Sequence, residues 1–331
     1  MVYNKDPLNE LLKENRTQPR SFNTVLVVIF VACSAVLMIL LRTEIFRIYG
    51  WALFLALPFL IGFYSSLLAS LEKKQRLSQC IKISISTILL AAVFLILIAL
   101  EGIICIIMAL PPALILTLAG TACGYWIQKI SWDRYTKQTL TVLTIFIFPL
   151  FLSVESNLNL KPSLNEVKSS IVINAGKHIV WDEVITSDLP APDEFIFNTG
   201  IAYPIKAEID GKGVGTVRYC IFSTGKFVEP IEVWDEPHLL KFSVTHSPPP
   251  MKELSIYSQI HPAHLDGFLK SKKGQFKLIE IDKNTTLLQG TTWYENTMWP
   301  ESYWNLWSDY IIHKIHTRVL KHIKTTSESE A

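Results

Sequence analysis

The stretch at residues 300–323, PESYWNLWSDYIIHKIHTRVLKHI, decides the fold of this 331-residue chain. On a helical wheel one side of it carries Trp304, Ser308, Ile311, Ile315, Val319 and Ile323. Pro300 stands near the expected start, where a missing backbone N–H costs nothing, and basic residues crowd the last turns, where the helix dipole favours them. Residues 286–295, just upstream, are rich in strand formers. A long amphipathic helix that follows antiparallel strands must bury its apolar face against their sheet, so the sequence predicts an α+β domain.

Further segments upstream predict the rest of this domain. Residues 169–175 are typical of a strand and 177–186 of a short helix, and successive strands are expected at 214–246, 274–281 and 286–295. We therefore expect the domain to cover residues 169–324, after a linker at 154–168 and before a disordered tail at 325–331.

One hairpin within this domain has a recognisable turn. Ser223-Thr224-Gly225-Lys226 is a hairpin signal, because glycine supplies a positive φ. A two-residue loop at Thr224-Gly225 sets Phe222 opposite Phe227 and Cys220 opposite Glu229. On that register Arg218 is diagonal to Glu229 on the same face of the sheet.

The apolar residues, half of the chain, are concentrated before residue 155. After a polar cytoplasmic tail at 1–23, five apolar runs predict membrane spans at 24–41, 50–71, 83–102, 110–128 and 138–153. The stretch between residues 83 and 127 is too long for one span, and Pro111-Pro112 is expected to break any helix that passes through it. The sequence therefore predicts a membrane domain at residues 24–153.

Lysine and arginine in the short loops predict the orientation. One set of loops holds Lys73, Lys74, Arg76, Lys82, Lys129, Arg134 and Lys137, whereas the other set holds Arg42 and Arg47. The positive-inside rule therefore predicts an inside N-terminus. Five crossings place the C-terminal domain outside, and one crossing fewer would place it in the cytoplasm.

Glu101 is the most unusual residue of the membrane half. An acid at the bilayer centre costs about 2.5–3.5 kcal/mol, so such residues usually have a pairing partner or a function. One interpretation places Glu101 at the outer headgroup level, where it ends the third span. The other gives it a buried polar role.

Charge and composition exclude several functions. The net charge of +2 and the lack of a basic stripe with interleaved aromatic residues exclude nucleic acid as a partner. Of five cysteines only Cys220 lies in the C-terminal half, so that half has no internal disulfide. The sequence contains no P-loop, GxGxxG or HExxH motif, and we expect no cofactor.

The order of a strand, short helices, antiparallel strands and a long C-terminal helix resembles the START-like superfamily, also called SRPBCC. It includes polyketide cyclases and dehydrases, the birch-pollen allergen group and lipid-transfer domains. The resemblance covers residues 171–186, 215–244 and 274–323, and the pattern Glu101-Gly102…Cys105…Met108-Ala109…Pro111 is similar to a membrane-tethered bacterial subgroup. The resemblance implies a bent sheet wrapped around the last helix, with an apolar cavity between them. It also implies a bacterial inner membrane, with the domain on the periplasmic side if five spans are present. It implies no single activity, and no catalytic residue is transferred.

Several aromatic residues could line such a cavity or fill the core instead. Our candidates for the cavity are Trp304, Ser308, Trp307, Trp293, Tyr294, Phe222 and Phe227. Arg218 and Glu229 are either a buried pair that orients a ligand or acts as acid and base, or an exposed cross-strand pair worth less than about 1 kcal/mol. The exposed pair is the simpler interpretation.

Histidines supply weaker candidates for a metal site. His261, His264 and Asp266 have a spacing that could bind zinc, but no cysteine supports it, and a surface loop or a lid is the simpler interpretation. His313 and His316 are neighbours on the last helix, and we expect both to be solvated.

Three functions follow from these observations. The first is a membrane-anchored domain that binds a lipid or another hydrophobic small molecule, with membrane lipids as its surroundings. The second is a cyclase- or dehydrase-like enzyme with Glu229, Arg218 or a histidine as proton carrier. The third is a sensor or scaffold in which Glu101 and Pro111-Pro112 respond to a ligand. The oligomeric state is not indicated by the sequence.

Overall fold

The computed structural model describes residues 21–41, 43, 50–71, 74–130, 155, 161–257, 260–265 and 267–331. The chain divides into two compact units. The first comprises Met1–Ile39, Leu55–Leu95 and Leu110–Leu152, and the second comprises Leu40–Phe54, Ile96–Ala109 and Ser153–Ala331. The second unit therefore contains the C-terminal domain together with two short segments from the apolar half.

Apolar helices dominate the described part of the N-terminal half. They are α2 (Ser21–Leu40), the π-helix η2 (Ala52–Ala56), α3 (Leu57–Ala69), α4 (Leu77–Leu97) and α5 (Ile103–Lys129). Three stretches are long and apolar enough to cross a membrane, Ala52–Ala69, Leu77–Leu97 and Ile103–Lys129, and a shorter apolar helix covers Thr24–Leu40. Four of the five expected spans therefore coincide with apolar helices. The fifth, at 138–153, lies outside the described residues.

Helices α3 and α5 pack closely through glycines. A Cβ atom on Gly62 would lie 1.9 Å from the backbone oxygen of Thr117, and a Cβ on Gly120 would lie 1.9 Å from the backbone oxygen of Phe59. Small residues let the backbones of membrane helices approach in this way. The contact leaves no room for a side chain at either position.

The structure differs from the expected helix break at Pro111-Pro112, because both prolines lie inside α5. Prolines are tolerated in apolar helices when neighbouring groups and local adjustments satisfy the freed carbonyl groups. Helix α4 ends at Leu97, earlier than the expected residue 102. Glu101 consequently lies in the short turn between α4 and α5.

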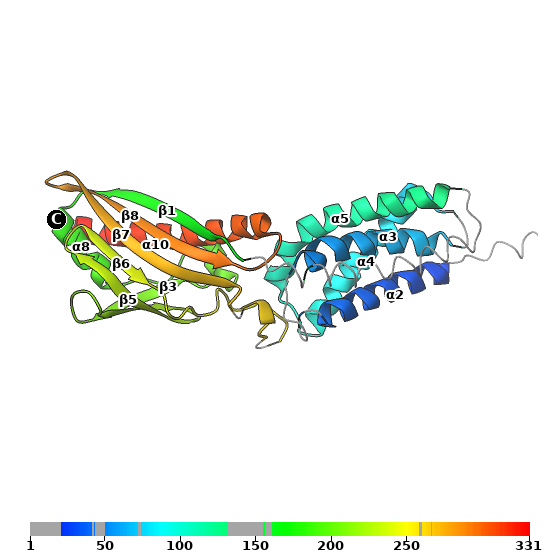
Figure 1. Ribbon diagram of the computed structural model, residues 1–331, viewed down its shortest axis with the longest axis horizontal. Coiled ribbons are helices and arrows are strands. Elements are labelled where there is room, and N and C mark those ends of the chain that lie inside the picture. The colour runs from blue at the N-terminus through cyan, green and yellow to red at the C-terminus, as the bar shows by residue number, and fades with distance from the viewer. Residues whose placement is uncertain are drawn as a thin grey trace, which may run out of the picture. The chain divides into compact units, whose positions relative to one another are not determined.

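The C-terminal domain is built on one antiparallel sheet of eight strands in the order β1-β8-β7-β6-β5-β4-β3-β2. The strands are β1 (Leu164–Ile173), β2 (Ser187–Asp188), β3 (Pro204–Asp210), β4 (Val217–Phe222), β5 (Gly225–Asp235), β6 (Leu239–Ser243), β7 (Leu269–Asp282) and β8 (Thr285–Asn296). The helices are α8 (Lys177–Ile185), α9 (Phe195–Asn198), the 3-10 turn η3 (Ala263–Leu265) and α10 (Glu301–Glu330). Figure 1 shows α10 running along the sheet, where it contacts strands β1 and β8. This arrangement confirms the expected α+β class with a helix gripped by a curved sheet.

The core lies between this sheet, α8 and α10. Its fully buried side chains include Trp181 of α8, Leu240 and Leu288 of the sheet, and Leu320 and Ile323 of α10. The inward face expected for the last helix is confirmed at Trp304, Ser308, Ile311 and Ile323, which are buried.

The domain boundaries are wider than expected. β1 begins at Leu164, inside the expected linker, and α10 continues to Glu330 through the expected disordered tail. Strand β3 was not among the expected elements.

The loop of the β4–β5 hairpin lies one residue earlier than expected, so each residue of β4 pairs two residues earlier on β5 than predicted. Its loop is Ser223-Thr224, so that Phe222 pairs with Gly225 and Cys220 with Phe227. Gly225 follows the loop with φ of +149°, a conformation that favours glycine. Thr224 also donates a hydrogen bond from Oγ1 to the Pro249 carbonyl at 2.8 Å, which holds the loop in this position.

Candidate functional site

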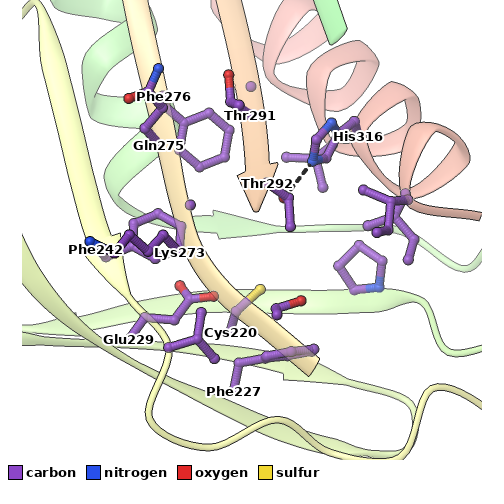
Figure 2. Close-up of a pocket in the computed structure, with 18 of the residues that line it drawn as sticks. Cys220, Phe227, Glu229, Phe242, Lys273, Gln275, Phe276, Thr291, Thr292 and His316 are labelled. Carbon is purple, nitrogen blue, oxygen red and sulfur yellow. Dashed lines mark hydrogen bonds between the residues drawn. The ribbon is translucent and has the colours of Figure 1, made fainter. Parts of the chain in front are cut away.

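A cavity of about 130 Å³ lies between the curved sheet and α10. Strands β4 to β8 and the start of β3 form its walls, and α10 closes it. Four phenylalanines from the sheet line it: Phe222, Phe227, Phe242 and Phe276. The rings of Phe222 and Phe227 meet edge to face, with 4.8 Å between their centroids. Figure 2 shows Phe227, Glu229 and Cys220 on one side of this space and Thr292 and His316 on the other.

The cavity also contains a buried ion pair. Arg218 lies directly opposite Glu229 across the β4–β5 ladder, and the guanidinium Nη1 donates a hydrogen bond to Glu229 Oε2. Only 5% of the Arg218 side chain and 8% of the Glu229 side chain are exposed. The simpler interpretation from the sequence, an exposed pair, is therefore wrong. The one-residue shift of the loop moves each cross-strand partner by two residues, which turns the expected diagonal neighbours into a direct cross-strand pair.

Aromatic rings surround the guanidinium of Arg218. Its Cζ lies 5.4 Å from the ring centroid of Phe242 and 5.6 Å from that of Phe276. Such cation–π contacts are strongest where water is excluded. The Nε–H of Arg218 is buried and has no hydrogen-bond acceptor among the described residues.

Burial controls the ionisation of these groups. Burial raises the pKa of Glu229 above its ordinary value, although Arg218 opposes this shift. Burial alone would lower the pKa of Arg218, but the Glu229 carboxylate outweighs it and the pKa is raised, so the guanidinium stays charged. Burial raises the pKa of the neighbouring Cys220 to about 12, so this thiol is protonated at neutral pH. The cavity therefore holds a paired charge and an unreactive thiol.

His316 lines the side of the cavity formed by α10. Its Nε2 lies 2.7 Å from Thr292 Oγ1, a bond drawn in Figure 2, and its Nδ1 lies 3.2 Å from Ser169 Oγ. Ser169 Oγ also lies 2.8 Å from His313 Nδ1. Burial, assisted by His313, lowers the pKa of His316 to about 4. His316 is therefore a neutral, hydrogen-bonded wall residue, and the expectation that it is solvated is wrong.

Two of the seven residues expected in the cavity, Phe222 and Phe227, line it. Trp304, Ser308, Trp307, Trp293 and Tyr294 are not among its lining residues. Tyr294 is fully buried and donates its hydroxyl proton to Asp309 at 2.6 Å, whereas Trp293 donates to Glu166 at 2.9 Å. The cavity is lined by α10 residues from Ile312 to Leu320. Because a helix rises about 1.5 Å per residue, its first turns lie beyond the cavity.

Trp304 and Ser308 are packing residues of the first turns of α10. The ring of Trp304 lies 5.1 Å from that of Phe54, and its Nε1 donates to the Trp299 carbonyl at 3.2 Å. Ser308 donates to the carbonyl of Trp304 at 3.1 Å. Trp307 is half-buried.

The loop residues that were candidates for a metal site, His261, His264 and Asp266, do not form a cluster among the described residues. His261 is exposed, His264 is buried, and Asp266 lies outside the described residues. His264 instead contacts Glu101, at 3.2 Å between Nδ1 and Oε2. Two residues that the sequence singled out separately thus form one pair. Cys105, four residues after Glu101, also joins this group, and their closeness in the sequence was the available signal.

No family model matches the sequence, and no curated protein matches it. The C-terminal half is similar to several solved structures. Norcoclaurine synthase from Thalictrum flavum, in complex with dopamine and hydroxybenzaldehyde, is 15% identical, with a TM-score of 0.34 over 51% of this chain and 90% of that chain. The ZhuI aromatase/cyclase from Streptomyces sp. R1128 is 11% identical, with a TM-score of 0.35 over 51% of this chain and 96% of that chain. The protein XoxI from Bacillus cereus is 15% identical, with a TM-score of 0.33 over 50% of this chain and 98% of that chain.

Proposed function

We propose that the chain is a membrane-anchored binding protein whose C-terminal domain holds a small hydrophobic molecule between the sheet and α10. The observation that carries this proposal is the cavity itself, which has phenylalanine walls and one neutralised ion pair, Arg218–Glu229. Mostly apolar walls with a few placed polar groups are typical of small-molecule sites. The apolar helices supply the anchor, and a hydrophobic ligand would partition into the same membrane.

The size of the cavity limits the ligand. An apolar cavity of about 150 Å³ holds one benzene ring, whereas drug-sized ligands occupy about 300–1,000 Å³. The 130 Å³ present here fits a single ring or a short acyl segment. A complete two-chain lipid is therefore not favoured as the ligand of this conformation.

Arg218 supplies the polar contact that would orient such a ligand. Its buried Nε–H has no acceptor among the described residues, and a buried donor without a partner costs about 1–3 kcal/mol. A carbonyl or hydroxyl oxygen on the ligand would remove that cost. The ligand class that fits best is an aromatic or short acyl compound with one oxygen.

Acid–base catalysis, the alternative, is less well supported by the same groups. Arg218 cannot release a proton in the physiological range, and Glu229 is already held by Arg218. With its pKa lowered to about 4, His316 is a weak base. We therefore favour binding over a cyclase- or dehydrase-like reaction.

The test is recovery of the ligand from the full chain. The protein is purified in mild detergent, extracted with organic solvent, and the extract is analysed by mass spectrometry. We expect one compound in stoichiometric amount. A chain that stays empty, even after incubation with membrane extract, would contradict the proposal.

A cavity-filling variant makes this test specific. Gly290 lines the cavity, and the nearest atoms to a Cβ placed there are 3.7 Å away in Phe276 and 3.9 Å away in Leu320. Gly290→Val therefore fits its surroundings while it fills the space, and we expect it to lose the compound. Gln289→Val, the next position on β8 and outside the cavity lining, is the matched control and should keep it.

A further inference from the structure

Four chemically active side chains converge at a place separate from the ligand cavity. Glu101 lies in the turn before α5 and Cys105 in the first turn of α5. Glu253 and His264 lie in the long segment between β6 and β7. All four belong to the second compact unit. The chain thus brings a thiol, an imidazole and two carboxylates together from segments far apart in sequence.

Three atoms of this cluster face one another. Cys105 Sγ lies 2.5 Å from Glu253 Oε1 and 2.9 Å from His264 Nε2, and His264 Nε2 lies 3.5 Å from Glu253 Oε1. The other ring nitrogen of His264, Nδ1, lies 3.2 Å from Glu101 Oε2. The imidazole of His264 therefore lies between Cys105 and Glu253 on its Nε2 side and the carboxylate of Glu101 on its Nδ1 side.

The cluster is removed from solvent. The exposed fraction of the side chain is 0% for Glu253, 7% for His264 and 10% for Glu101. Glu253 Oε2 is buried and has no hydrogen-bond partner among the described residues. A buried carboxylate oxygen without a partner is costly, so a cation is the natural group to satisfy it.

The surrounding backbone is shaped to admit Glu253. A Cβ atom on Gly102 would lie 1.8 Å from Glu253 Oε2, so only glycine leaves room for this carboxylate. The backbone N–H of Ile103 donates to the Leu254 carbonyl at 2.9 Å, which fastens the same two segments together. Phe197, Met251 and Leu265 pack around Cys105 and form an apolar shell.

The distances suit one small metal ion. Zinc binds sulfur at about 2.3 Å and nitrogen or oxygen at about 2.0–2.2 Å, so ligand atoms around a tetrahedral zinc lie about 3.3–3.8 Å apart. The observed separations of 2.5–3.5 Å require the ligands to move apart by about 1 Å. Sulfur, imidazole nitrogen and carboxylate oxygen together are the ligand types that zinc prefers.

We propose that this cluster is a zinc site in which Cys105 Sγ, His264 Nε2 and Glu253 Oε1 bind the ion. Glu101 Oε2 lies 3.2 Å from His264 Nδ1, and with zinc bound we expect it to accept a hydrogen bond from Nδ1–H, which fixes the tautomer that presents Nε2 to the metal. Glu253 Oε2 is buried without a hydrogen-bond partner among the described residues, and it would gain one if the carboxylate binds the ion through both oxygens. The zinc site does not depend on a ligand in the cavity, so the two proposals are independent and each can be tested without the other.

A cysteine nucleophile activated by His264 and Glu101 would use the same contacts but fits less well. The carboxylate of Glu253 lies 2.5 Å from Sγ, so a thiolate formed there without a cation would face a second negative charge. A divalent ion stabilises both anions at once.

The test uses the full chain purified in detergent through an affinity tag that contains no histidine. Elemental analysis should find one equivalent of zinc. After the zinc is removed, Co²⁺ should produce the strong near-ultraviolet absorption of a cobalt–thiolate bond. Cys105→Ser should abolish that absorption, whereas Cys123→Ser, an exposed cysteine of the same helix, should leave it unchanged. His264→Gln should release the metal, and His261→Gln, from the same loop, should retain it.

Two further measurements guard against variants that fail to fold. X-ray absorption of the unaltered protein should show one sulfur at about 2.3 Å from zinc beside nitrogen and oxygen ligands. Glu101→Gln should keep the cobalt–thiolate band but weaken zinc binding about 10- to 100-fold, as expected of a residue that only positions a ligand. Substoichiometric zinc together with no cobalt–thiolate band in the unaltered chain would overturn the proposal. Retention of that band in Cys105→Ser would overturn it as well.

Discussion

Arg218 and Glu229 face each other across the β4–β5 ladder, both side chains are buried, and the guanidinium of Arg218 lies against the rings of Phe242 and Phe276. The attraction within a buried pair repays the loss of hydration only when both partners are present. The pair therefore stabilises the fold around the cavity only while both partners are present, and it is also a polar part of the cavity lining.

Removing one member of this pair should be much more harmful than removing both. Arg218→Met or Glu229→Leu leaves a buried charge unpaired and should lower the free energy of unfolding by about 3–5 kcal/mol. The double variant leaves no charge and should be close to the unaltered protein. Denaturant unfolding of the C-terminal domain in the detergent-solubilised full chain, followed by tryptophan fluorescence, measures all three. Additive losses in the double variant would show that the charges act independently.

His316 should make the domain less stable in mild acid. Its pKa is lowered to about 4 in the folded state, whereas in the unfolded chain it has the ordinary value of about 6.5. The unfolded state therefore binds a proton first as the pH falls. Stability is full above about pH 6.5 and declines through the window down to about pH 4, by at most about 3 kcal/mol.

A substitution isolates this contribution. His316→Asn should flatten the loss of unfolding free energy between pH 6.5 and pH 4 relative to the unaltered chain. His238→Asn is the matched control, since His238 is half exposed on the surface, and it should keep the full slope. An unchanged slope in His316→Asn would assign the acid sensitivity to other groups.

The sequence predicted the positions of helices and strands better than it predicted which side chains face the cavity. The apolar stripe of the last helix and the strands that carry β-branched residues were found, because periodicity reports which side chains are buried together. Period-2 alternation does not say which sheet face becomes concave, and that depends on the curl of the whole sheet. The sequence therefore correctly predicted that Trp304 and Ser308 are buried, but both lie outside the cavity. Phe242, Phe276 and His316 line the cavity and were not predicted to do so.

Pairs of residues that are far apart in the sequence, such as Glu101 and His264, could not be predicted for a different reason. Glu101 and His264 were each noted as unusual, but only the tertiary fold brings the turn before α5 to the loop after β6. Glu253 carried no local signal at all. The hairpin register depended on the position of the loop, since a loop at Ser223-Thr224 rather than Thr224-Gly225 moves every cross-strand partner by two residues.

The glycine contact between α3 and α5 should be intolerant of a methyl group. In Gly120→Ala the new Cβ would collide with the backbone oxygen of Phe59, an atom that cannot rotate away. We expect a loss of helix packing of more than about 1 kcal/mol, because close backbone approach supplies the van der Waals contacts that hold membrane helices together. Gly176→Ala, at the start of α8, is the control, since its nearest neighbour to a Cβ lies 3.4 Å away. Unfolding in increasing sodium dodecyl sulfate compares the two, and equal stability would contradict the close contact.

The positive-inside rule predicts the side of the membrane that the C-terminal domain occupies. The loop between α3 and α4 carries Lys73, Lys74 and Arg76 and is expected to be cytoplasmic. With the N-terminus inside and five spans, the C-terminal domain is expected on the outer side.

This orientation predicts the behaviour of reporter fusions in bacterial cells. Alkaline phosphatase, which is active only outside the cytoplasm, should be active when fused after Ala331 and inactive when inserted after Lys74. A fluorescent protein that matures only in the cytoplasm should give the reverse pattern at the same two sites. Phosphatase activity at Lys74 with none at Ala331 would place the domain inside. That result would also place the α3–α4 loop outside, and the positive-inside rule would fail for this chain.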